Sequence, residues 1–454
     1  MTTRLNCTRS SSSPGSRTRR ESKRSLYVSN AGPPELKRYL RSLKKIRVFF
    51  EYAPGNGHQA ATASMISRLR SLGFLGEIEI LVGPETTQRL HYLIPGFQPV
   101  PHKAEILADG STRQRLPGGR DSIVITRSLV ETALLLGRVE LAVTGAGNGL
   151  RAKQLNADVM FKGQPRAWPT ASEIEFDGRE SIRLPPSPGY SKQVAQPDNV
   201  ELFLRSQMGH RADLRNKMPL LRSIVTSNHP LELLPMYGVG AHRDGPKNVA
   251  MIAQALEIAQ RESPNAFQRK IVICILSNLN EIEIDDLRGR LSDRVELVTP
   301  PATSLPMSHP ERPQVIIAAP GGTTQGVFDY LFYRATLGAT GAGRNAQDLA
   351  EGIGIPVLNM TGTIEMTSHV WAANAHSGGV IKRAHNLFAS NSGSDLRDLV
   401  SYFTQIKNTP SITDLFREQA RARASTPDIV EIGLEALIQR QKVKGGGSRI
   451  WPRA

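Results

Sequence analysis

Residues 48–74, VFFEYAPGNGHQAATASMISRLRSLGF, pass from an apolar run through a Gly-rich loop into a helical pattern. Met65, Leu69 and Leu72 are spaced i, i+4 and i+7, so they share one face of a helix. Residues 77–83, EIEILVG, then read as another buried strand. A strand, a crossover helix and a second strand are the unit of a parallel sheet, which predicts an α/β fold.

The same alternation recurs along the chain. Further strands are predicted at 122–126, 139–145, 234–242, 270–278, 294–300 and 314–320. Helices are predicted at 127–137, 247–262, 321–335, 394–405 and 428–443. A chain of 454 residues is too long for one ordinary domain, so we predict two α/β domains.

Composition sets the predicted limits of these domains. Residues 1–44 are a basic, Ser/Arg-rich arm with too few large apolar residues to fold alone, and we predict that they are disordered. The first domain spans 45–225 and holds an irregular, proline-rich insertion at 163–200. The second domain spans 226–425, and residues 426–454 form a helix and a basic tail.

The net charge of +16 lies mainly in the arm, because residues 1–47 hold 13 Lys and Arg against two Glu. The other 407 residues carry only +5, so no specific nucleic acid is expected as a partner. No apolar run reaches the ~20 residues of a membrane helix, which leaves at most peripheral membrane contact. The arm lacks the apolar centre of a secretory signal. We therefore predict that the protein is cytoplasmic, or that the arm directs the protein to an organelle or into a host cell.

The strongest local signal is the Gly-rich end of the strand at 314–320. Gly321 and Gly322 let the backbone approach a ligand, and the helix that follows offers unpaired N–H groups suited to a phosphate. The hydroxyls of Thr323 and Thr324 would add donors. The alternative is a tight turn in which Thr323 only caps the helix.

A second candidate loop follows the strand at 234–242. Arg243 and Lys247 stand at the start of the helix predicted there, a position that suits a diphosphate. A solvated basic loop explains the same residues equally well.

These features together resemble one family. The stretch 53–74, the segment 316–331 and the run GRNAQDLAEGIGIPVLNM at 343–360 are similar, in order and spacing, to glycosyltransferases of the GT-B fold. The resemblance covers roughly residues 45–435. It implies two Rossmann-like domains with parallel sheets facing an interdomain cleft, the acceptor on the first domain and a nucleotide-sugar donor on the second.

The resemblance also implies roles for single residues. His58, carried by the loop residues Gly55, Asn56 and Gly57, matches the histidine that acts as general base toward the acceptor hydroxyl, a role an imidazole can perform near neutral pH. Asp121, or else Asp109, is the expected carboxylate that orients it. The residues implied for the donor are Gly321, Gly322, Thr323, Thr324, Gln325, Arg243, Lys247, Asn345, Gln347 and Asp348.

The implied function is transfer of a sugar from a nucleotide sugar to an unknown acceptor, which is a small molecule, a glycan or a protein. The mechanism is expected to be inverting, because retaining members of the family carry two glutamates eight positions apart near the donor, and no such pair lies in the second domain before residues 354–358. No carboxylate or histidine cluster has metal-ligand spacing, so neither a metal nor a cofactor is expected.

A sugar-nucleotide epimerase on the same fold and a non-catalytic nucleotide-binding regulator remain alternatives. The sequence departs from the family at Pro320, where a histidine is expected before the glycines.

Overall fold

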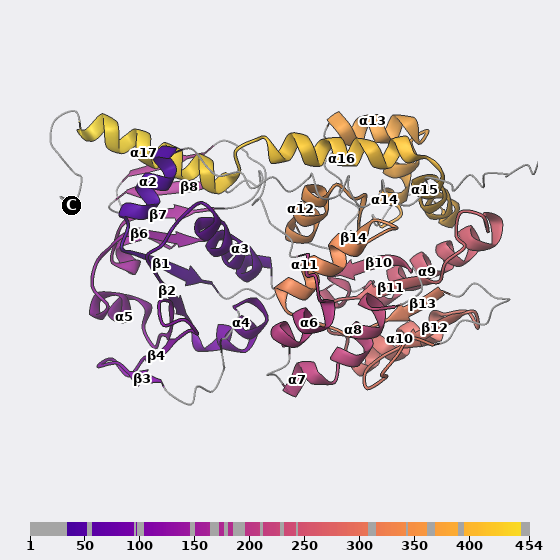
Figure 1. Ribbon diagram of the computed structural model, residues 1–454, viewed down its shortest axis with the longest axis horizontal. Helices are drawn as coiled ribbons and strands as arrows, with labels where there is room; N and C mark the ends of the chain where they lie inside the picture. Colours follow the sequence, from indigo (N-terminus) through magenta and orange to yellow (C-terminus); the bar gives the residue numbers. More distant parts are fainter. Residues whose placement is uncertain are drawn as a thin grey trace, which may run out of the picture.

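The structure is a computed structural model, and its two sheets lie side by side with helices on both faces of each (Figure 1). It describes residues 34–51, 57–94, 97, 104–145, 150–163, 172–176, 180–184, 196–208, 212–227, 231–241, 244–306, 315–341, 344–360, 368–388 and 395–445.

The first sheet has nine strands in the order β3-β4-β5-β2-β1-β6-β7-β8-β9. They are β1 Lys45–Phe50, β2 Glu77–Val82, β3 Glu105–Ile106, β4 Thr112–Arg115, β5 Ser122–Ile125, β6 Val139–Thr144, β7 Ala157–Lys162, β8 Glu173–Phe176 and β9 Glu180–Arg183. The five central strands are parallel, and antiparallel pairs extend both edges. The central order, 3-2-1-4-5 in chain sequence, is that of a doubly wound Rossmann sheet.

The second sheet has six strands in the order β12-β13-β11-β10-β14-β15, and all neighbours are parallel. They are β10 Glu232–Tyr237, β11 Ile271–Ile275, β12 Val295–Val298, β13 Val315–Ala318, β14 Ala339–Gly341 and β15 Val357–Asn359. Every residue of β11 and β13 is buried, which explains their continuous apolar sequences. The strand orders confirm the predicted α/β class with two Rossmann-like domains, the architecture of the GT-B fold.

Helices cover both faces of the first sheet. They are α2 Pro34–Ser42, α3 Gly57–Ser71, α4 Thr87–Leu93, α5 Leu129–Leu135, α17 Ile429–Gly445 and the short 3₁₀ helices η1 Pro84–Thr86 and η2 Ala152–Leu155. Met65, Leu69 and Leu72 are fully buried on the face of α3 that the spacing predicted. Helices α2 and α17 share this core, whereas α5 and η2 cover the opposite face.

The second sheet is covered in the same way. Helices α9 Gly245–Glu262, α10 Glu281–Arg290, α13 Ser368–His376, α14 Val380–Asn386, α15 Leu396–Asn408 and α16 Pro410–Ala424 build one core. Helices α6 Val200–Met208, α7 Ala212–Arg215, α8 Met218–Val225, α11 Gln325–Arg334 and α12 Arg344–Ile353 build the other. The short η3 Val239–Ala241 follows β10.

Residues 34–44 do not belong to a disordered arm, which corrects the arm predicted for 1–44. Leu36, Tyr39 and Leu40 of α2 are buried in the first core. Lys442 of α17 binds Glu35 of α2 at 2.8 Å, and the two helices lie together in Figure 1. The burial of α2 thus depends on a helix from the far end of the chain. Residues 1–33 lie outside the described residues.

The chain divides between the domains differently from the predicted limits. Helices α6–α8 precede residue 226 but pack on the second sheet, so that domain takes in residues 200–225. Helix α17 returns to the first domain, where Val430, Leu434 and Leu437 are fully buried. A buried arginine of α3, Arg68, binds Asp428 at 2.6 Å beside the start of α17.

The insertion predicted as irregular at 163–200 contains a β-hairpin. Strands β8 and β9 pair with each other, and β8 extends the first sheet beside β7. Ile174 is fully buried and Phe176 is almost so, which gives the hairpin an apolar face. The many prolines on either side hid this pattern, and residues 164–171 and 177–179 lie outside the described part of the chain.

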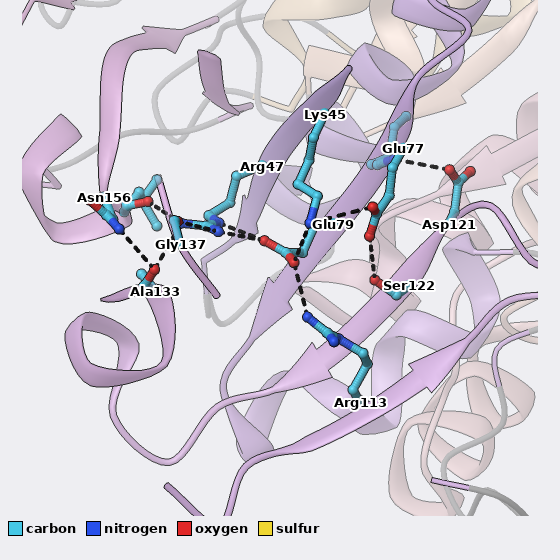
Figure 2. Close-up of polar contacts among 12 residues, drawn as sticks. Lys45, Arg47, Glu77, Glu79, Arg113, Asp121, Ser122, Ala133, Gly137 and Asn156 are labelled. Atoms are coloured by element: carbon cyan, nitrogen blue, oxygen red, sulfur yellow. Dashed lines mark hydrogen bonds and ion pairs between the residues drawn. The ribbon is translucent and has the colours of Figure 1, made fainter. Parts of the chain in front are cut away.

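A buried ion pair joins β1 and β2 near their amino ends (Figure 2). Arg47 and Glu79 are both fully buried, and Arg47 Nη2 lies 2.6 Å from Glu79 Oε2. The guanidinium also donates to the carbonyls of Ala133, Gly137 and Leu155 at 2.6–3.1 Å. These bonds tie β1 to α5 and η2, so the pair holds the amino edge of the first sheet, opposite the carboxyl end of β1.

Candidate functional site

The predicted phosphate loop lies at the carboxyl end of β13. Gly321 adopts φ +79°, a conformation that favours glycine, and its N–H donates to Ile275 O at 3.3 Å. Gly322 N donates to Asn278 Oδ1 at 2.7 Å. A Cβ on Gly321 would lie 2.7 Å from the same oxygen. The loop therefore needs glycine, because the backbone packs directly on Asn278 from the end of β11.

Two side chains that the sequence analysis missed complete this loop. Lys217, in the turn before α8, donates from Nζ to Gly322 O at 2.9 Å and to Asn278 Oδ1 at 3.4 Å. Asn278 is the last residue of the strand predicted at 270–278, so it could have been found by listing polar residues at strand ends. Lys217 has no such signal, because it lies 105 residues before Gly322.

Helix α11 follows this loop directly, and the N–H groups of its first turn have no partner within the helix. Thr324 is the N-cap residue, with extended backbone at φ −66° and ψ 154°, but its side chain makes no cap. Thr323 and Thr324 are 9% and 6% exposed, and Thr323 Oγ1 contacts the Thr324 carbonyl at 3.4 Å. Gln325 Nε2 donates to Asp329 at 2.6 Å. The backbone is therefore what this helix start offers a ligand, more than the side chains predicted for that purpose.

The end of β10 is tied to the end of β11. Ser277 Oγ accepts from Gly238 N at 2.6 Å and from Val239 N at 3.2 Å. Lys247 lies exposed in the first turn of α9, which begins just after this loop. Arg243, the other predicted diphosphate contact, lies outside the described residues.

Helix α12 holds the residues expected at the donor sugar, and two of them have structural partners. Asp348 binds Arg423 of α16 at 2.9 Å, and Arg423 also binds Glu351 at 2.8 Å. Gln347 Nε2 donates to Glu351 Oε1 at 3.0 Å. The Asp348 carboxylate is buried in this ion pair, which argues against the predicted contact of Asp348 with the donor sugar. The side chain of Asn345 is not among those described.

In the first domain the predicted base follows β1. Gly57 begins α3 and His58 is its second residue, but the side chain of His58 and the loop residues Gly55 and Asn56 lie outside the described part. Gln59 Nε2 donates to Glu51 O at 3.0 Å, which fixes the first turn of α3 on the end of β1.

The end of β6 lies close to the same turn. Gly145 N donates to Thr62 Oγ1 at 3.0 Å, and a Cβ on Gly145 would lie 2.4 Å from Thr62 N. Strands β1 and β6 are neighbours at the point where the strand order reverses. Ligands of open α/β sheets bind at such switch points, so the first turn of α3, which contains His58, lies at a favourable place for a ligand.

Asp121 does not orient His58, which corrects the prediction. It binds Arg70 near the carboxyl end of α3 and accepts from Ile78 N at 3.0 Å. With a rise of 1.5 Å per residue, Arg70 lies about 18 Å along α3 from His58. Asp121 precedes β5 and so lies at the amino edge of the sheet, whereas His58 follows the carboxyl end of β1.

Asp109, the other carboxylate considered for this role, also has a structural partner set. Its oxygens accept from Thr132 Oγ1 at 2.5 Å and from Ser111 N and Oγ at 2.9 Å. The hydrogen bond from Thr132, followed by those from Ser111, lowers the pKa of this carboxyl below its ordinary value. These bonds close the turn before β4. Since Asp109 and Asp121 both have structural partners, no carboxylate is assigned to orient His58.

Comparison with known proteins finds distant structural similarity to several enzymes. No family model matches it, and no curated protein sequence does. UDP-GlcNAc 2-epimerase from Neisseria meningitidis is 14% identical, over 88% of this chain and 100% of its own, with a TM-score of 0.42. Trehalose 6-phosphate synthase from Burkholderia multivorans is 12% identical, over 91% and 100%, at 0.40. A family 9 glycosyl transferase from Veillonella parvula is 10% identical, over 70% and 80%, at 0.36. With TM-scores below 0.5, the functional argument rests on this chain's own residues.

Among the described residues, no helix is long and apolar enough to cross a membrane. In the same part of the chain, no three His, Cys, Asp or Glu side chains gather as metal ligands would.

A groove of about 880 Å³ is lined by residues of α6 and α8, among them Arg205 and Arg222, and by Thr303. We do not assign this groove as the functional site despite its volume, because the residues at the ends of β10, β11 and β13 do not line it. The strand ends, which present backbone donors, glycines and Asn278, remain the candidate site.

Replacing Gly321 by alanine should weaken nucleotide binding by about 10- to 100-fold, because the new Cβ displaces the Asn278 oxygen that holds Gly322 N. Calorimetric titration with nucleoside diphosphates would measure this loss. Gly118→Ala is the matched control, since Gly118 has φ +93° and no atom near its would-be Cβ. If both variants bind equally well, the loop is not the phosphate site.

A buried histidine lies at the carboxyl end of β15. His385 Nδ1 accepts from Asn359 N at 3.2 Å, and burial lowers the pKa of the imidazole to about 4. The folded state therefore binds fewer protons than the unfolded state between pH 4 and about 6.5. Stability should fall as the pH drops through this window, by up to about 3 kcal/mol from this group.

Urea unfolding at pH 7 and pH 4.5 would measure that fall. His385→Asn keeps an acceptor for Asn359 N but does not titrate, so its stability should depend less on pH. An unchanged pH dependence in this variant would assign the loss to other groups.

Proposed function

We propose that this chain is a nucleotide-sugar-dependent glycosyltransferase whose donor diphosphate binds at the carboxyl ends of β10, β11 and β13. The observation that carries the proposal is the Gly321–Gly322 loop, built on Asn278 and followed directly by the N-terminus of α11. The N–H groups of a helix's first turn, together with the helix dipole, stabilise the charge of a phosphate group.

The first domain would hold the acceptor near the start of α3. His58 would accept the proton of the acceptor hydroxyl as that oxygen attacks the anomeric carbon from the face opposite the leaving group. The bond from the anomeric carbon to the diphosphate breaks as the new glycosidic bond forms, which inverts the configuration. The negative charge that develops on the leaving diphosphate would be stabilised by the Gly-rich loop and α11.

The test is turnover by purified protein. UDP-, GDP-, ADP- and CDP-sugars would first be screened by thermal shift, and the binding sugars then incubated with a pool of alcohols, glycans and peptides. We expect release of nucleoside diphosphate that depends on an acceptor, with an inverted product by NMR.

Each other outcome names a different function. An epimeric nucleotide sugar formed without acceptor would identify a sugar-nucleotide epimerase instead. Binding without any turnover would indicate a regulatory nucleotide-binding protein. If no nucleotide sugar shifts the melting temperature, the donor site is wrong.

A further inference from the structure

Lys217 lies where the Gly-rich loop meets the other domain. Its Nζ donates to Gly322 O at 2.9 Å and to Asn278 Oδ1 at 3.4 Å, both in the second domain. The same ammonium lies 5.9 Å from the ring centroid of Tyr92, which belongs to α4 of the first domain. One cation thus contacts the candidate phosphate loop and the opposite domain at the same time.

The position of Tyr92 makes this a contact between domains. Its ring is partly buried against the core that α6, α8 and α11 form on the second sheet. Lys217 stands at the N-cap of α8, one residue before Met218, which packs on the same core. Movement of the Lys217 head group therefore changes the surface on which Tyr92 rests.

We propose that Lys217 is a positioning residue that couples binding of a nucleoside diphosphate at the Gly-rich loop to the contact between the two domains. The inference rests on the proposed donor site. Gly322 O, Asn278 Oδ1 and the Tyr92 ring are neutral partners, and a diphosphate oxygen forms a stronger, charge-assisted bond with an ammonium. Binding would draw Nζ toward the phosphate and weaken its cation–π contact with Tyr92.

Thermodynamic linkage makes this coupling reciprocal. If nucleotide binding alters the contact of Lys217 with Tyr92, a change at Tyr92 must alter nucleotide affinity. Tyr92 would do so from the domain opposite the donor loop. A lysine that only supports the local fold of the loop would show no such dependence.

The first experiment measures the Kd of the tightest-binding nucleotide among UDP, GDP, ADP and CDP by calorimetry. Lys217→Met should raise this Kd by about 10- to 100-fold and should reduce its salt dependence, because one charge-assisted bond is lost. Lys382→Met is the matched control, since Lys382 Nζ also lies 5.9 Å from an aromatic ring, that of Trp371. We expect the control to stay within about twofold of the unmodified protein.

The second experiment is a double-mutant cycle on the same Kd. Tyr92→Leu should change the affinity about two- to fivefold, within the range of an exposed cation–π contact, and should lose this effect in the Lys217→Met background. Tyr92→Phe retains the ring and should retain the coupling. Additive effects of Tyr92→Leu and Lys217→Met would overturn the proposed link.

Different experimental outcomes would overturn the role of Lys217 and the proposed donor site. If Gly321→Ala weakens nucleotide binding and Lys217→Met does not, the donor site stands and the role of Lys217 is wrong. If the unmodified protein binds none of the four nucleotides, both proposals fall. A melting curve of each variant separates loss of binding from loss of fold.

Discussion

Replacing His58 by alanine is expected to lower the rate of sugar transfer by about 10²- to 10⁴-fold, the usual contribution of a general base. The acceptor hydroxyl would then lose its proton to water during attack. Nucleotide affinity should stay unchanged, because the donor loop belongs to the other domain. The loss should therefore appear in kcat, measured at saturating donor.

The pH profile adds a second readout of this role. In the unmodified protein, kcat should fall below the pKa of an imidazole, and this acid limb should vanish in His58→Ala. His376→Ala is a suitable control, because His376 lies exposed on α13 and bonds only the carbonyl of its own helix at Ala372 among the described residues. A kcat within threefold of normal in His58→Ala would mean that His58 is an ordinary turn residue.

Replacing Arg47 by methionine is expected to lower the free energy of unfolding by about 3–5 kcal/mol, the cost of breaking a buried ion pair. Glu79 would lose its main partner in a fully buried position, and three backbone carbonyls would lose their donor. Urea unfolding followed by circular dichroism would measure the change.

Arg113→Met provides the comparison for this prediction. Arg113 Nη2 lies 3.3 Å from the same Glu79, but the arginine side chain is 20% exposed. Its loss should cost roughly 1 kcal/mol or less. Adding Glu79→Leu to Arg47→Met should restore only part of the stability, because the carbonyls stay unpaired. Equal losses for the two arginine variants would contradict the assignment of Arg47 as the central partner.

The sequence predicted those parts of the fold that depend on local pattern. Strands such as β11 and β13 are buried on both faces, so their apolar runs stand out without any knowledge of their neighbours. Helix α3 shows its buried face in the spacing of three residues. The helix α2 was missed because its apolar face is buried only with the help of α17, almost 400 residues later.

The same distinction between local pattern and long-range contact applies to the candidate site. The Gly-rich loop follows a strand and precedes a helix, so its position at a strand end could be read directly. Lys217 could not be found, because only the folded chain brings it to Gly322. The sequence alone already argued against Asp121 as the residue that orients His58. It precedes the predicted strand 122–126, and in a parallel sheet that places it at the edge opposite His58.

The return of α17 to the first domain affects how this protein is made. Strands β1–β9 leave the ribosome well before residue 429, and α17 begins 246 residues after the end of β9. At roughly 5–20 residues per second, that gap lasts about 12–50 s. Throughout this interval Val430, Leu434 and Leu437 are missing from the first core, and Arg68 lacks the carboxylates of Asp428 and Glu431. The domain synthesised first is thus the last to complete its core, and a nascent chain must be kept from aggregating until its final helix arrives.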